Sequence, residues 1–121
     1  MRYRLLLIDV AVVIAFVLAG RSSHEEALSP SEVGRTAAPF LVALAVGWAA
    51  TRAWRDPVAA ATGAGVFATT LAGGMLLRRV VFGDGTAWTF VVVAGVFLGL
   101  GLVGWRLAAG RMTARSVTAG R

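Results

Sequence analysis

The stretch RYRLLLIDVAVVIAFVLAGR, residues 2–21, has the length and composition of a membrane-spanning helix. Residues 5–20 are apolar with one exception, Asp9, and arginines lie at both ends. A helix needs about 20 mostly apolar residues to cross a bilayer. A carboxylate inside such a segment is costly, so Asp9 is the first candidate functional residue.

The whole chain shares this apolar character. Of its 121 residues, 58% are hydrophobic and 15% are charged, whereas soluble domains are about 45–50% apolar and about 25% charged. This composition predicts a single domain whose solvent is lipid. The net charge of +6 comes from arginines that lie at the ends of apolar runs. That placement favours membrane orientation over nucleic-acid binding.

Residue types needed for several chemistries are missing from the sequence. It contains no Cys and one His, which excludes disulfides, thiolate sites and metal sites built from several histidines. It also lacks the Gly-x-Ser-x-Gly and His-Glu-x-x-His patterns and a phosphate-binding glycine loop. We therefore expect no enzyme activity, no cofactor and no metal.

The apolar runs predict an all-α fold, an integral membrane bundle of four transmembrane helices. The expected spans are residues 3–20, 38–53, 57–78 and 87–109, followed by a short basic tail at residues 111–121.

Local sequence signals place the ends of these helices. Ser29, Pro30 and Glu32 fit a capping box at the start of the second helix. Residues 56–57, Asp-Pro, fit the N-cap and first position of the third helix. The segment FGDGT, residues 82–86, predicts a turn before the fourth helix, and Gly110 is expected to end that helix.

Arginine is distributed unequally between the two sides of the predicted bundle. The side that carries the N-terminus holds eight arginines and the other side holds four: Arg2, Arg4, Arg52, Arg55, Arg106, Arg111, Arg115 and Arg121, against Arg21, Arg35, Arg78 and Arg79. The positive-inside rule then predicts that both termini are cytoplasmic.

We interpret Trp105 and Arg106 as an interfacial anchor. A cleaved signal peptide is the competing interpretation of the first run, and Asp9 argues against it.

Small residues recur at four-residue spacing in the last two predicted helices. Gly65, Thr69 and Gly73 form one stripe, and Gly95 and Gly99 form another. Such stripes let helix backbones approach closely. They predict either packing within the bundle or a homodimer contact through one of the stripes.

Asp9 lies about four residues inside the predicted cytoplasmic edge, which is about 6 Å at 1.5 Å per residue. The same depth places Trp48, Thr62 and residues 101–105 in one layer, with two arginines just below, Arg52 and Arg55. One interpretation is that Asp9 accepts hydrogen bonds from Trp48, Thr62 or an arginine and fastens the bundle. The other is a titrating carboxylate in an ion or proton path.

A second polar cluster is expected on the opposite face of the membrane. Its members are charged or titratable residues that follow the first span, begin the second or end the third: Arg21, His24, Glu25, Glu26, Arg35, Arg78 and Arg79. This cluster is either a solvated, mutually neutralising rim or a site for an anionic ligand or lipid headgroup.

Three stretches, IDVAVVIAFVLAGRSSHE, APFLVALAVGW and LLRRVVFGDGTAWTFVVVAGVFLGLGLVGWR, occur in this order. Together they resemble the small prokaryotic membrane-protein family numbered 3054 among the domains of unknown function. The resemblance covers nearly the whole chain and implies a four-span membrane protein, without a known activity or ligand. It is carried by Asp9, Gly20, Arg21, His24, Pro39, Phe40, Trp48, Arg78, Phe90, Trp105 and Arg106. Of these, Asp9, Arg21, His24 and Arg78 are the candidate functional polar residues.

The sequence therefore predicts a multi-pass protein of the prokaryotic plasma membrane whose partner is the lipid bilayer. The leading functional hypothesis is a non-catalytic scaffold, accessory subunit or lipid-interacting protein, because the polar residues lie near the two ends and the middle is apolar. The alternative is a small proton-coupled transporter or channel that uses Asp9 as its titrating carboxylate.

Overall fold

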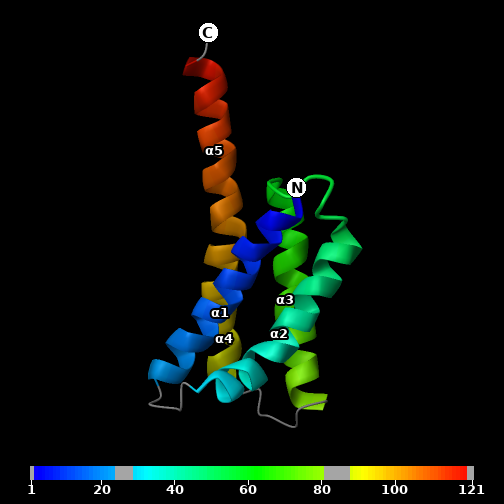
Figure 1. Cartoon of the computed structure of the whole chain (residues 1–121), viewed down its shortest axis with the longest axis vertical. Coiled ribbons are helices and arrows are strands. Elements are labelled where there is room, and N and C mark those ends of the chain that lie inside the picture. The colour runs from blue at the N-terminus through cyan, green and yellow to red at the C-terminus, as the bar shows by residue number, and fades with distance from the viewer. Residues whose placement is uncertain (1, 24–28, 81–87, 120–121) are drawn as a thin grey trace.

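The computed structural model describes residues 2–23, 29–80 and 88–119, and these residues are helical apart from Ser29 and the α2–α3 connection, residues 52–59 (Figure 1). The elements are η1 (Arg2–Leu5), α1 (Leu6–Ser23), α2 (Pro30–Thr51), α3 (Ala60–Val80), α4 (Trp88–Leu98), η2 (Gly99–Val103) and α5 (Gly104–Ala119). The last three follow one another without a break, so they form one long helix with a π-helical turn, η2, in its middle. The fold is therefore four helices, and both chain ends lie toward the same end of the bundle.

Three of these helices are long and apolar enough to cross a membrane. They are Pro30–Thr51, Ala60–Val80 and the segment Phe90–Arg111, whereas the apolar part of α1, Leu6–Gly20, is shorter. The outer surface of the bundle is also apolar, because large hydrophobic side chains on every helix are more than half exposed, among them Leu7, Val42, Leu76 and Leu100. An apolar exterior around a packed interior is the arrangement of a multi-pass membrane protein.

Helices α2 and α3 pack through small residues that face each other in antiparallel order. A Cβ added at Gly65 would lie 2.7 Å from Thr51 Cγ2, and one added at Gly73 would lie 3.0 Å from Ala43 Cβ. Between these two contacts, a Cβ at Gly47 of α2 would lie 3.2 Å from Thr69 Cβ. The predicted stripe on α3 therefore serves packing within the chain, against a matching small-residue stripe on α2.

Four phenylalanines form an aromatic cluster in the core of the bundle. Phe16 of α1 lies at its centre, with ring centroids 5.6 Å from Phe40 of α2, 5.7 Å from Phe90 and 5.8 Å from Phe97 of α4. The Phe40 ring occupies the space that Gly74 of α3 leaves open, since a Cβ at Gly74 would collide with it. Edge-to-face and tilted aromatic contacts therefore join α1, α2 and α4, and α3 packs on the cluster at Gly74.

The start of α2 confirms the predicted cap, with Ser29 as N-cap and Pro30 in the first turn. The Ser29 side chain accepts a hydrogen bond from the backbone N–H of Glu32 at 3.4 Å. The helix runs through Pro39 and ends at Thr51, and its C-cap residue Arg52 has the left-handed φ of 53°.

Two predicted helix ends are wrong. Helix α3 begins at Ala60 and not at Asp56–Pro57, because the Pro57 carbonyl is held by a side chain from another helix, as described below. Gly110 does not end the last helix, since α5 continues to Ala119. A single glycine lowers helix propensity by only about 1 kcal/mol, and the arginines, alanines and methionine around it favour helix. The predicted turn at residues 82–86 lies outside the described residues.

Candidate functional site

Asp9 lies on the buried face of α1 and is fully buried. The other buried residues of this helix are Val13, Phe16 and Val17. These positions follow Asp9 by four, seven and eight residues, which is the spacing of one helix face. The backbone of α1 thus directs the carboxylate toward the helices it packs against.

The carboxylate of Asp9 accepts four hydrogen bonds from three side chains. Its Oδ1 atom accepts from Trp105 Nε1 at 2.8 Å and from Arg106 Nη1 at 2.9 Å. Its Oδ2 atom accepts from Trp48 Nε1 at 2.7 Å and from Arg106 Nη2 at 2.7 Å. A carboxylate has about four lone-pair positions, so Asp9 is saturated with donors.

Arg106 donates four hydrogen bonds from its five N–H groups. It pairs with Asp9 in the bidentate, two-on-two geometry, and its side chain is fully buried. Its Nε atom donates to the Pro57 carbonyl at 2.7 Å, and Nη1 also donates to the Leu102 carbonyl at 2.8 Å. The guanidinium carbon lies 4.6 Å from the Trp105 ring centroid, a cation–π contact.

The π-helical turn η2 helps to place Arg106 on the buried face. The buried positions of the last helix are Ala94, Leu98, Leu102 and Arg106, each four residues after the previous one. In a regular helix of 3.6 residues per turn this spacing would drift steadily around the axis. A π turn closes its hydrogen bonds over five residues and so reduces that drift.

Two glycines make the space that this arrangement requires. A Cβ added at Gly63 of α3 would lie 2.7 Å from Arg106 Cδ, so the bare backbone accommodates the arginine stem. A Cβ at Gly101 in η2 would collide with Val12 of α1, so this glycine lets the last helix approach the first. All four helices and the α2–α3 connection therefore contribute to the surroundings of one ion pair.

The chemistry available to this site is limited because the carboxylate of Asp9 has no free hydrogen-bond acceptor position. A bidentate, charge-assisted pair inside a low-dielectric core is strong when every polar atom has a partner. Protonating Asp9 would displace at least one of its donors, and a ligand would have to do the same. Among the described residues, no group of three His, Cys, Asp or Glu side chains is placed to hold a metal ion.

The sequence identified part of this cluster and misassigned the rest. The depth argument allowed hydrogen bonds from Trp48, Thr62 or an arginine and placed Trp105 in the same layer, and the Trp48 bond is confirmed. The arginine bound to Asp9 is Arg106, and not Arg52 or Arg55. The interpretation of Trp105 and Arg106 as an interfacial anchor is wrong, because both side chains bind Asp9 and Arg106 is 1% exposed. A signal was available, since Trp and Arg are the side chains that best donate to a buried carboxylate.

The candidates on the opposite face are only partly described. His24, Glu25 and Glu26 lie outside the described residues, and Arg21 is placed only as part of the α1 backbone. Arg78, in the last turn of α3, lies with its guanidinium carbon 4.4 Å from the Phe90 ring centroid. The structure therefore links Arg78 to the aromatic cluster and does not bring it near Asp9.

A comparison with protein families adds to this geometry. The family model described as "Protein of unknown function (DUF3054)" matches residues 6–109. The chain belongs to the DUF3054 family. The matched segment contains both members of the ion pair, Asp9 and Arg106, together with Trp48 and Trp105. The family description names no function, and no curated protein and no solved structure matches the chain.

Proposed function

We propose that this DUF3054 protein is a non-catalytic four-span membrane protein, a scaffold, accessory subunit or lipid-interacting protein of the prokaryotic plasma membrane. Its termini would face the cytoplasm. In this proposal α1 crosses the membrane with the three longer helices, despite its shorter apolar part, because its buried face contributes to both the ion pair and the aromatic cluster. The role of Asp9 is to hold the helices in one arrangement.

The observation that supports this proposal is the saturation of Asp9. A carboxylate that carries protons across a membrane must exchange them with water or with another titratable group. Asp9 instead accepts four hydrogen bonds from two tryptophans and an arginine. None of these side chains gains or loses a proton in the physiological pH range. The fully buried core of the bundle is otherwise mostly apolar, with Val13, Val66 and Leu98 among its members and Thr70 as a buried polar residue.

The substitution Asp9→Asn tests the proposal, because it keeps the shape of the side chain and removes its charge. Arg106 would then be buried without a counter-charge, and breaking a buried pair in this way costs about 3–5 kcal/mol. We expect a large fall in the midpoint of thermal unfolding of the purified protein in detergent. Asp56→Asn is the matched control, because Asp56 is exposed and the same charge is removed; its midpoint should stay near that of the wild type.

Proton flux into liposomes that contain the purified protein separates this proposal from the transporter alternative. The structural role predicts no flux driven by a pH step in the wild type or in either variant. Flux in the wild type, together with a well-folded Asp9→Asn variant that has none, would make Asp9 a coupling group and overturn the proposal.

A further inference from the structure

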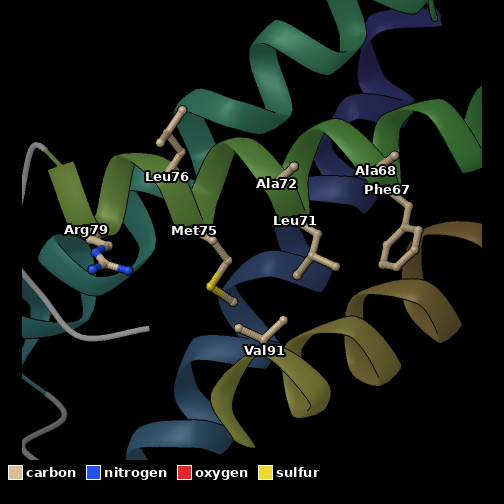
Figure 2. Close-up of a pocket in the computed structure, with 8 residues that line it drawn as sticks. All are labelled: Phe67, Ala68, Leu71, Ala72, Met75, Leu76, Arg79 and Val91. Carbon is tan, nitrogen blue, oxygen red and sulfur yellow. The ribbon is translucent and has the colours of Figure 1, made fainter. Parts of the chain in front are cut away.

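A shallow groove of about 640 Å³ runs along the outer surface between α3 and α4 (Figure 2). In Figure 2, Leu71 and Met75 of α3 point toward α4, where Val91 lies opposite them. Phe67 lies at one end of the groove and Arg79 at the other. The groove is therefore apolar along its length and carries one positive charge, at the end where α3 stops.

The shape of the groove follows from the spacing of residues on α3. Phe67, Leu71, Met75 and Arg79 are four residues apart and form one ridge, as expected for such a row. The neighbouring row begins with Ala68 and Ala72, whose side chains are too short to fill the space beside the first ridge. The two alanines therefore leave a trough beside the ridge.

The length and position of the groove match one leaflet of a bilayer. From Phe67 to Arg79 the helix rises about 18 Å at 1.5 Å per residue. Half of the hydrocarbon core is roughly 15 Å thick. Helix α3 is one of the candidate membrane spans, and Arg79 lies in its last turn and is exposed. The charged end of the groove is then at the level of lipid headgroups, and the apolar part at the level of acyl chains.

We propose that this groove binds a single phospholipid, with one acyl chain along α3 and α4 and the phosphate at Arg79. A guanidinium is the side chain best suited to a phosphate, because its fork of N–H groups matches two phosphate oxygens. Its neighbour Arg78 packs on the Phe90 ring, so the two arginines have different surroundings. This inference depends on the membrane placement in the proposed function and does not depend on the role of Asp9.

Native mass spectrometry of the intact protein, incubated in detergent with phosphatidylglycerol, tests the proposal. We expect one phosphatidylglycerol bound per chain at low lipid concentration. Ala72→Leu fills the trough and should remove that bound lipid. Ala64→Leu is the matched control, because Ala64 is an exposed alanine of the same helix that does not line the groove.

The phosphate contact is tested separately with Arg79→Gln and with diacylglycerol, which has the same chains and no phosphate. Arg79→Gln should weaken phosphatidylglycerol binding about tenfold, the loss of about 1.4 kcal/mol, and leave diacylglycerol binding unchanged. Arg111→Gln, which removes an exposed arginine outside the groove, should have no effect on either lipid.

Three results would overturn the proposal. Equal lipid binding by the wild type and Ala72→Leu would show that the lipids are not held in this groove. If Ala72→Leu lost the lipid and Arg79→Gln had no effect, the proposed contact between Arg79 and the phosphate would be wrong. A dimer mass that Ala72→Leu converts to a monomer mass would show that a second copy of the chain, and not a lipid, occupies the groove. An unstable Asp9→Asn variant is compatible with each of these results, so failure of the lipid proposal can be distinguished from failure of the role proposed for Asp9.

Discussion

Asp9 illustrates how one carboxylate can be accommodated in an otherwise apolar helix. The cost of moving it out of water is offset by four hydrogen bonds, two of them from a guanidinium in bidentate geometry. The guanidinium in turn also donates to two backbone carbonyls, at Pro57 and Leu102. Because each member has partners on several sides, loss of one member leaves the others buried and unsatisfied.

Gly63 is one of two glycines near the ion pair where an added methyl group would collide with a neighbour, the other being Gly101. In Gly63→Ala the new methyl group would lie 2.7 Å from Arg106 Cδ, in the middle of a side chain that is fixed at its far end. We expect overpacking to lower the free energy of unfolding by about 1–3 kcal/mol. Thermal unfolding of the purified variant in detergent measures this loss of stability.

Gly104→Ala is the control for this prediction, because no heavy atom outside the helix lies within 4 Å of the added Cβ. This substitution should be neutral or stabilising, since alanine favours helix more than glycine does. If Gly63→Ala and Gly104→Ala had the same unfolding midpoint, the close contact between α3 and the Arg106 stem would be wrong.

At the scale of elements, α2 and α3 form the most extensive helix pair of the bundle. Their contact surfaces are built from small residues with four-residue spacing on both helices. Bilayers provide little hydrophobic driving force between apolar helices, so close backbone approach and dispersion contacts hold such pairs together. The stability of the pair should therefore depend on the size of the residues along the stripe.

Gly73→Ala and Gly95→Ala test this dependence with the same chemical change. At Gly73 the added Cβ would lie 3.0 Å from Ala43 Cβ on α2, whereas at Gly95 it would lie 3.7 Å from Leu71 Cδ2, an ordinary contact. We expect Gly73→Ala to destabilise the protein by about 1–3 kcal/mol and Gly95→Ala to have little effect. Equal unfolding midpoints for the two variants would contradict the packing described for α2 and α3.

The sequence was sufficient for the features that depend on local signals or on depth. Ser29 could be recognised as a cap from the residues that follow it, and Trp48 could be placed at the depth of Asp9 by counting residues along straight helices. An arginine partner could be expected from its chemistry, but the choice of Arg106 could not be deduced, because it is 97 residues away from Asp9 and its direction depends on the π turn that precedes it. The start of α3 was mispredicted for a related reason. Asp56–Pro57 has the local form of a helix start, but the Pro57 carbonyl is used by Arg106 instead of by the first turn of a helix.

At the scale of the whole molecule, the proposed orientation places the start of α2 and the end of the last span on opposite sides of the membrane. The chain contains no cysteine, so single cysteines can be introduced without further changes. We expect Ser31→Cys to react with a membrane-impermeant maleimide in intact cells. Arg111→Cys should react only after the membrane is opened.

Both positions are exposed in the structure. A cysteine that does not react in intact cells would therefore be shielded by the membrane and not by burial in the bundle. The reverse pattern would place the termini outside the cytoplasm and leave the bundle itself unchanged. Labelling of both positions in intact cells would mean that they lie on the same side, which contradicts the proposed crossing of α2, α3 and the last helix.

The distance along the chain between Asp9 and Arg106 has a consequence for biosynthesis. The first helix leaves the ribosome long before the last one, so its carboxylate must wait without its main partner until nearly the entire chain has been inserted. A nascent chain that stops before residue 106 would leave the Asp9 carboxylate without its cationic partner. The ion pair therefore forms only after the chain has been synthesised as far as Arg106.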